Sequence, residues 1–494
     1  MERDGGDMTI SADPILPAAG TWSHRKKNGD PPFKQGVSTS THQFSGVADL
    51  LAAGKALRDT LPRQEHAHWK RRNNHIDPIR ILHQTDEGRL PELVPIRYGR
   101  MMQSPFAFFR GSAAVMAADL AQTATTGILV QACGDCHLAN FGGFATPERN
   151  VIFDINDFDE TLRAAWEWDV KRLVVSFVLA ARFIGLTESQ GREAAAEVSR
   201  SYRKAMRKFT EMHPLDVWYS RLSVEDVIDT VPKERRAAIK TRIEGALARS
   251  GSEMDFPRLA GMVGGQVGIR DNPPLIFHPD LARSPDFDRL LAKVFASYRE
   301  TLADDRRALL DQYRVVDAAI KVVGIGSVGR RCWIALLMSA TNHPLFLQFK
   351  EAVASVLEPY AGRSTYAHHG HRVVAGQRLM QPYSDMFLGW VSAQTKTGRK
   401  HYYVRQLRDA KIKPLVETFD AELLRLYGKA CGRVLARAHA KPGGQAIIGG
   451  YLGSSDQFDL AITNFAVTYA DQVERDYSAL KAAVKSGKTV VRLE

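Results

Sequence analysis

The spacing of apolar residues predicts long helical stretches along most of the chain. Between residues 166 and 249, apolar positions recur three or four residues apart, as on a helix with one buried face. The same spacing predicts a short helix at 112–121 and a longer one at 421–440. Another helix is predicted after Pro285, a residue suited to a first helical turn. Its apolar stripe consists of Phe287, Leu290, Leu291, Val294, Phe295, Tyr298 and Leu302.

Shorter, continuous apolar runs predict strands in two parts of the chain. Residues 127–133 and 151–153 flank a polar loop and are expected to form a hairpin-like unit. Residues 315–323, 332–338 and 345–350 predict a small antiparallel sheet late in the chain. The pattern therefore indicates an α+β protein that is mostly helical.

These patterns suggest four parts along the chain. Residues 1–45 are rich in Gly, Pro, Ser, Thr and charge without periodicity, which predicts a disordered tail. We expect a helical lobe at 46–310, a small β lobe at 311–395 and C-terminal helices at 396–494 that complete the helical lobe.

Composition indicates a soluble protein with anionic partners. Of the 494 residues, 44% are hydrophobic and 25% charged, and the formal net charge is +12. That charge suits nucleotide phosphates, nucleic acid or an acidic lipid surface, but basic residues are spread along the chain, so a nucleic-acid patch is not favoured. The longest apolar run, near 173–181, is far shorter than the ~20 residues of a membrane helix, which predicts no membrane span.

Four cysteines in a chain of this length, with no signal peptide at its start, predict a reducing, cytoplasmic location. Cys133 and Cys136 form a CxxC, but no second pair lies nearby at zinc-site spacing, so zinc or redox chemistry is not favoured.

A first group of polar residues follows the strand predicted at 127–133. Asp135 and Asn140 stand five residues apart in a loop, and Asp157 follows the next predicted strand. Phosphoryl transfer from ATP needs a carboxylate at the acceptor hydroxyl and oxygen ligands for Mg²⁺, and this D-x4-N followed by an aspartate supplies both. The alternative is a polar loop whose Asp and Asn cap backbone amides.

Acidic residues crowd around Asp157, where Asp154, Asp159 and Glu160 lie within seven residues. Repulsion among these carboxylates is relieved if a cation binds there. Asp154, Asp157 and Asp159 all remain candidates for the metal ligand.

A glycine-rich turn forms the second group, with Gly324, Gly326, Ser327 and Gly329 in a G-x-G-x-x-G pattern. The pattern alone also fits dinucleotide-binding folds or an ordinary hairpin. Because a strand rather than a helix is predicted after it, the arrangement favours the phosphate-covering loop of kinases.

Lys350 ends the third predicted strand and suits contact with the α- and β-phosphates. Glu351 and Glu358 are the expected acidic partners of its ammonium. In ordinary kinases the glycine loop and lysine precede the catalytic loop, whereas here they follow it. The sequence therefore predicts a protein-kinase-like bilobal fold that is circularly permuted, since proximity in space does not depend on chain order.

Several longer motifs carry two resemblances. Much of residues 50–480 resembles the bacterial family called domain of unknown function 2252, through the segments LVPIRYGRM, SPFAFFRG, GDCHLANFG, FDINDFDE, WEWDVKR and YADQVERD. The segment from Gly134 to Asn140 also resembles the H-G-D-x-H-x-x-N loop of aminoglycoside and choline phosphotransferases, with Cys133 in place of its first histidine. The second resemblance implies that Asp135 and His137 are catalytic residues and that Asn140 and Asp157 bind metal.

The function expected from these residues is an ATP- and Mg²⁺-dependent phosphotransferase whose acceptor is an unknown small molecule or peptide, with acidic acceptors suited to the net charge. The alternatives are an AMP transferase on the same fold and a catalytically silent nucleotide-binding or scaffold protein. Arg100, Arg110 and Arg172 are candidates for steering anions. Asp169, three residues before Arg172 on a predicted helix, is expected to pair with it.

Overall fold

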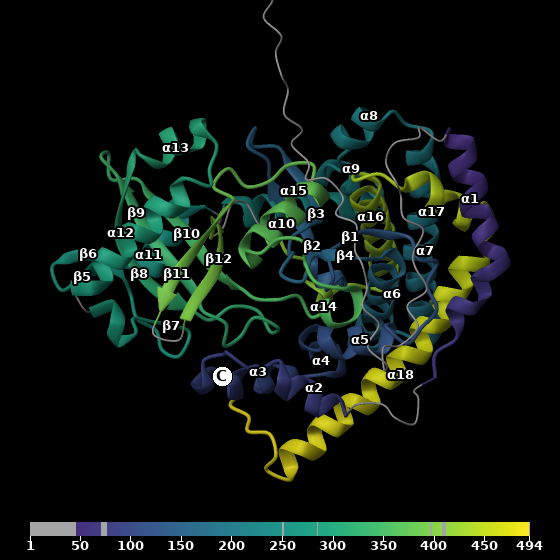
Figure 1. Cartoon of the computed structure of the whole chain (residues 1–494), viewed down its shortest axis with the longest axis horizontal. Coiled ribbons are helices and arrows are strands. Elements are labelled where there is room, and N and C mark those ends of the chain that lie inside the picture. The colour runs from purple at the N-terminus through teal and green to yellow at the C-terminus, as the bar shows by residue number, and fades with distance from the viewer. Residues whose placement is uncertain are drawn as a thin grey trace, which may run out of the picture. The chain divides into compact units, whose positions relative to one another are not determined.

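The computed structural model shows an α+β protein in which helices predominate (Figure 1). The tail predicted at 1–45 lies outside the described residues. The structure describes residues 46–70, 77–248, 251–283, 285–395, 398–407 and 412–493.

Four long helices hold most of the helical core: α6 (Trp166–Phe183), α7 (Glu188–Thr210), α16 (Ala421–Ala440) and α18 (Gln457–Lys485). Helix α6 is buried along nearly its whole length, which explains its continuous apolar sequence. Helix α16 has the bounds predicted from periodicity, and it is capped by the preceding Asp420, whose side chain accepts a hydrogen bond from the amide of Leu423. Glycines let α16 approach α7 closely, since a Cβ on Gly432 would lie 2.3 Å from the carbonyl of Val198.

The shorter helices include the two predicted at 112–121 and after Pro285. They are α1 (Val47–Thr60), α2 (Pro78–Gln84), α3 (Val94–Met101), α4 (Pro105–Gly111), α5 (Ala113–Leu120), α8 (Pro214–Tyr219), α9 (Val224–Asp229), α10 (Lys233–Ala248), α11 (Ser252–Leu259), α12 (Pro285–Arg299), α13 (Asp304–Leu310), α14 (Glu358–Ala361), α15 (His369–Met380) and α17 (Gln445–Leu452).

A six-stranded antiparallel sheet carries the glycine turn and Lys350, in the order β11-β12-β10-β9-β8-β7. Its strands are β7 (Ile276–Phe277), β8 (Tyr313–Lys321), β9 (Cys332–Ser339), β10 (Pro344–Ala352), β11 (Gly389–Thr395) and β12 (Gly398–Gln406). The three strands predicted in this region, now β8, β9 and β10, are confirmed. The sheet takes up more of the chain than residues 311–395, because β7 precedes this range and β12 follows it.

The apolar stripe of α12 packs on this sheet. Phe287 and Tyr298 belong to the same buried cluster as Leu337 and Leu347 of the sheet. Periodicity predicted the helix and its apolar face, but only the packing identifies the sheet as its partner.

The two strands around the polar loop do not pair with each other, so the predicted hairpin is wrong. Strand β1 (Leu129–Ala132) pairs with β4 (Leu162–Ala165), and β2 (Phe141–Ala145) pairs with β3 (Val151–Ile155). The sequence FGGFA of β2 carries two glycines, which weaken any local strand signal. A further small sheet joins β5 (Ala260–Val263) to β6 (Gln266–Ile269).

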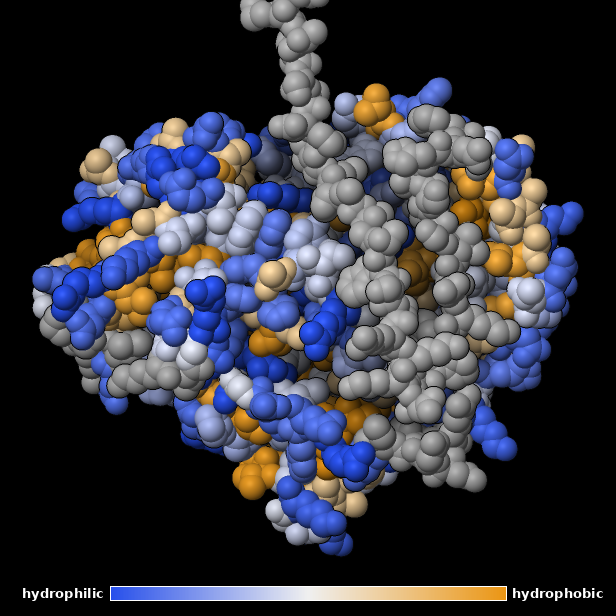
Figure 2. Space-filling model, in the orientation of Figure 1, coloured by the Kyte–Doolittle hydropathy of each residue, from blue (hydrophilic) through white to orange (hydrophobic). Residues whose placement is uncertain are grey.

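Two properties of the helices and surface bear on possible partners. In the described part of the chain, no helix combines the length and the apolarity needed to cross a bilayer. Hydrophilic residues are spread over the face seen in Figure 2, with smaller hydrophobic areas between them. On this face, hydrophilic residues are not gathered into one patch.

Candidate functional site

A cavity of about 330 Å³ brings the three sequence-predicted groups together. Asp135, Asn140 and Asp157 line it from the β1–β4 region, and the turn from Gly324 to Ser327 lines it together with Lys350. The Nζ of Lys350 lies 3.7 Å from Oδ2 of Asp157. The prediction that the lysine and the glycine turn share a cavity with both aspartates, with the lysine within roughly 10 Å of the metal-site carboxylates, is therefore confirmed.

The loop that carries Asp135 is fastened by a carboxylate on α6. Asp169 accepts hydrogen bonds from the backbone amides of Cys133, at 2.7 Å, and Gly134, at 3.0 Å. Gly134 has a φ of +83°, and a Cβ there would lie 2.4 Å from the carbonyl oxygen of Glu160. Only glycine therefore fits this turn without moving the chain.

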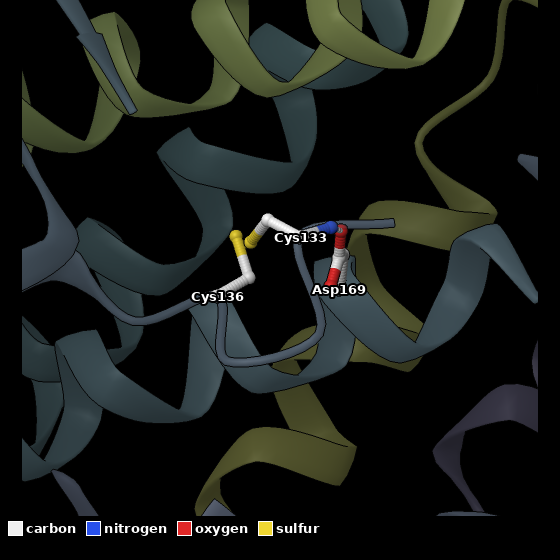
Figure 3. A group of neighbouring side chains, drawn as sticks. All are labelled: Cys133, Cys136 and Asp169. Atoms are coloured by element: carbon white, nitrogen blue, oxygen red, sulfur yellow. Dashed lines mark hydrogen bonds between the residues drawn. The ribbon is translucent and has the colours of Figure 1, made fainter. Parts of the chain in front are cut away.

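Cys133 and Cys136 lie beside this carboxylate, and their sulfurs face each other (Figure 3). The two thiols and Asp169 have ligand atoms within 4.8 Å of one another. Burial raises the pKa of Cys136 to about 11 and that of Cys133 well above its usual range, so both remain thiols. Because Asp169 accepts two amide hydrogens from the loop, its carboxylate fastens the loop to α6.

Asp135 is held by an arginine from α6. The Nε of Arg172 donates to Oδ1 of Asp135 at 2.6 Å, and the side-chain amide of Asn140 donates to the carbonyl of Asp135 at 2.9 Å. The expected pairing of Asp169 with Arg172 is wrong, because the two side chains hold different parts of the loop. Periodicity placed both on one helix but could not show that the loop lies against it.

His137 lines the cavity but is buried in its wall. Burial lowers the pKa of His137 to about 3, so its ring is neutral near pH 7. Its Nε2 lies 3.9 Å from Oδ2 of Asp135, which is beyond hydrogen-bonding distance. In this arrangement His137 shapes the wall behind Asp135.

Asp157 and Asp159 form an acidic pair opposite Lys350. The amide of Asp159 donates to Oδ1 of Asp157 at 3.1 Å, and Lys350 forms its closest ion pair with Asp159. Asp159 also accepts hydrogen bonds from Tyr403, at 2.8 Å, and Ser327, at 3.2 Å. The glycine turn is thus joined to the acidic pair by the Ser327 hydroxyl.

The charges of this group stabilise one another in a buried place. Burial alone raises the pKa of Asp157, but the cations of Lys350 and Arg405 outweigh it and hold the pKa below its usual value. Burial lowers the pKa of Lys350, and Asp157 and Asp159 together raise it well above the usual value. The carboxylate of Asp157 and the ammonium of Lys350 are therefore both charged near pH 7.

The donor set suits magnesium. Asp157 and Asp159 offer carboxylate oxygens, and Asn140, whose amide nitrogen already donates to Asp135, offers its amide oxygen. The ammonium of Lys350 lies against the two carboxylates, where a cation is electrostatically favoured.

Asp154 and Glu358 do not line the cavity. Asp154 is buried, and both its oxygens accept from Nη2 of Arg437, at 2.8 and 2.7 Å. Glu358 begins α14, where it accepts from the amide of Ser355 at 3.3 Å. Of the two acids expected to pair with Lys350, Glu351 instead accepts from the backbone amide of Arg331 at 3.0 Å, and Glu358 makes no described contact with the lysine.

A family comparison covers both the helical part and the sheet. Residues 89–483 match the model of a family described as "Uncharacterized protein conserved in bacteria (DUF2252)". The chain belongs to the DUF2252 family. No curated protein and no solved structure matched it.

In this DUF2252 chain, two side chains hold the cavity's acids through contacts that were not predicted from sequence. Tyr403 lies on β12, outside the strands predicted from sequence, and its hydroxyl donates a hydrogen bond to Asp159 in the loop between β3 and β4. Arg172 was only a candidate for steering anions, and its carboxylate partner appears only when α6 packs against the loop. No pattern in the neighbouring sequence indicates either contact, because the partners lie far apart along the chain.

Proposed function

We propose that this protein is an ATP- and Mg²⁺-dependent phosphotransferase with a permuted, kinase-like bilobal fold. The observation that carries the proposal is the meeting of Lys350, the glycine turn and the two aspartates Asp135 and Asp157 in one cavity. These are the parts that phosphoryl transfer requires, namely a phosphate clamp, a metal site and a carboxylate for the acceptor.

Each part has a role in this proposal. Asn140, Asp157 and Asp159 hold Mg²⁺, which supplies charge neutralisation at the phosphates when bound. Lys350 and the backbone of the glycine turn contact the phosphates of ATP. Asp135 accepts the proton of the acceptor hydroxyl and is oriented for this by Arg172.

The order of elements around Lys350 supports the kinase-like reading. The glycine turn joins antiparallel strands β8 and β9, and the lysine lies on the next strand, β10. Helix α15 follows before β11, at the place of the kinase helix whose glutamate pairs with this lysine, but α15 carries no acidic residue. Here Asp159 pairs with Lys350 in place of that glutamate, and this ion pair joins the lysine to the loop that carries Asp157.

Product analysis tests the proposal directly. With ATP labelled at the α- or γ-phosphate, transfer of the γ-label to an acceptor or to water supports phosphotransfer, whereas transfer of the α-label shows AMP transfer. No turnover and no Mg-ATP binding by the wild-type protein would leave only a silent or scaffold protein.

Two variants assign the roles. Asp157→Ala is expected to abolish Mg²⁺-dependent ATP binding in calorimetry with little loss of fold, because it removes a metal ligand. Asp135→Asn is expected to keep ATP affinity and lose at least two orders of magnitude in turnover, on the order of 3 kcal/mol of barrier. Asp216→Ala, an exposed position on α8, is the matched control.

A further inference from the structure

One wall of the cavity is strongly cationic and takes no part in the roles proposed above. Four arginines line it: Arg89, Arg97, Arg110 and Arg330. Their described carboxylate partner is Asp86, which forms ion pairs with Arg97 and, at 3.7 Å, with Arg89. Arg330 donates instead to the backbone carbonyls of Glu87, at 2.9 Å, and Thr85, at 3.3 Å. The wall therefore keeps a net positive charge.

Arg110 is the member of this wall without a polar partner. It makes no hydrogen bond or ion pair within the described residues, and its Nε is buried. Its described side-chain contact is the ring of Phe106, whose centroid lies 5.8 Å from Cζ. The guanidinium keeps its charge, and its buried Nε needs an anion or water to complete its hydrogen bonds.

The backbone on both sides of Arg110 is held in place. Nη2 of Arg172 donates to the carbonyl of Phe109 at 2.9 Å, and Nη2 of Arg97 donates to the carbonyl of Gly111 at 3.1 Å. The guanidinium is thus presented to the cavity from a fixed segment, as a preorganised binding group should be.

Arg110 also lies between Asp135 and the glycine turn. Arg172, which binds the carbonyl of Phe109, donates to Asp135 as well. On the other side, a Cβ on Gly326 would lie 3.6 Å from the carbonyl oxygen of Arg110. Burial lowers the pKa of Arg110 and the charge of Asp135 opposes this, which is consistent with their closeness.

We infer that the acceptor is itself an anion, carrying a phosphate or a carboxylate in addition to its hydroxyl, and that Arg110 binds this anionic group while Asp135 faces the hydroxyl. The inference rests on the proposed function and names the substrate class of the same site. The phosphates of ATP already have Lys350, the glycine turn and the metal site, so Arg110 remains for the second substrate.

The reaction balances with these two substrates alone. The hydroxyl oxygen of the acceptor bonds to the γ-phosphorus of ATP, and the bond from that phosphorus to the β,γ-bridging oxygen breaks. ADP leaves with the electron pair of the broken bond, and the hydroxyl proton passes to Asp135 and then to solvent. The anionic group on Arg110 is unchanged.

Calorimetry on the full chain with inorganic phosphate and, separately, acetate tests the inference, each titrated with and without saturating Mg-AMP-PNP. We expect phosphate or acetate to bind the nucleotide-loaded wild type, and the preferred anion to distinguish the two acceptor groups. Arg110→Ala should weaken this binding at least about ten-fold, because a charge-assisted hydrogen bond is lost. Its affinity for Mg-AMP-PNP should stay within about three-fold of the wild type.

Two further variants keep the result interpretable. Arg433→Ala, at an exposed position on α16, should bind both probes as the wild type does. Arg110→Gln keeps the side-chain stem as far as Cδ and a polar end without the charge, and it replaces Arg110→Ala if that variant fails to fold.

Three outcomes would overturn the inference while leaving phosphotransfer in place: neither anion binds the nucleotide-loaded protein, anion affinity is unchanged in Arg110→Ala, or Mg-AMP-PNP affinity falls with anion affinity. Phosphate that binds only without nucleotide would likewise assign Arg110 to the phosphates of ATP. Arg110-dependent phosphate binding by a protein that does not bind Mg-AMP-PNP would support the anion site and reject the proposed function.

Discussion

Arg437 and Asp154 show how one buried ion pair affects stability without serving the cavity. Both side chains are almost fully buried, and burial raises the pKa of Asp154 even beside the guanidinium. We expect Arg437→Met to lower the free energy of unfolding by about 3–5 kcal/mol, since it leaves a buried carboxylate unpaired. Urea unfolding measures this.

The double variant Asp154→Leu/Arg437→Met is the control for that prediction. Replacing both partners with apolar side chains removes the desolvation penalty together with the attraction. It should therefore be more stable than Arg437→Met, and a double variant no more stable than the single one would contradict this account.

The pKa of Lys441 allows a second test at the scale of single residues, in which stability depends on pH. Burial, with the nearby Arg437, lowers the pKa of Lys441 to about 8, although Asp154 opposes the shift. The folded protein therefore binds this proton less tightly than the unfolded chain, whose lysines titrate at about 10.4. Below pH 8 the charged lysine lowers stability, and the penalty fades as the pH rises from about 8 toward 10.4.

The stability of Lys441→Met relative to the wild type should therefore be higher at pH 7 than at pH 9.5. Urea unfolding of both proteins at the two pH values measures the difference. Lys55→Met, at an exposed position on α1, should differ from the wild type by the same free energy of unfolding at both pH values. If Lys441→Met changes the free energy of unfolding equally at both pH values, the pKa of Lys441 is not lowered in the folded protein.

At the scale of elements, the loop that carries Asp135 and the end of α6 provide a matched pair of glycines. Gly134 and Gly185 have φ values of +83° and +78°, but an added Cβ meets the Glu160 carbonyl at 2.4 Å in the first case and open space in the second. Gly185→Ala should lower stability by about 1 kcal/mol, from backbone strain alone. Gly134→Ala should lower it by about 3 kcal/mol, because overpacking adds to that strain.

Thermal or urea unfolding of the two variants measures the difference, and turnover provides a second readout. Only Gly134→Ala should reduce activity, since its close contact moves the loop that holds Asp135. Equal losses of stability in both variants would show that the loop relaxes freely around a methyl group.

At the scale of the whole molecule, ligand binding should stabilise parts of the chain that are far apart in sequence. The cavity takes residues from both 85–160 and 324–356, so the Mg-ATP of the proposed function would contact both groups at once. At 100 times its dissociation constant, Mg-AMP-PNP should raise the free energy of unfolding by about 2.7 kcal/mol. Urea unfolding with and without the ligand measures this, and Asp157→Ala should show no increase.

Local sequence patterns predicted many elements and identified several of the side chains that line the cavity. Helix α16 and strands β8, β9 and β10 follow from apolar spacing, because periodicity records which face of an element is buried. The residue types of Asp135, Asn140, Asp157 and the glycine turn likewise indicate metal and phosphate chemistry by themselves.

Only the tertiary structure decided which of these residues act together. It paired β1 with β4, assigned Arg172 to Asp135 and brought Asp159, rather than Glu351 or Glu358, to Lys350. Such contacts join residues far apart along the chain and depend on how helices and sheets pack, which no local pattern encodes. The sequence by itself thus determined which chemical groups are present, and packing decided their partners.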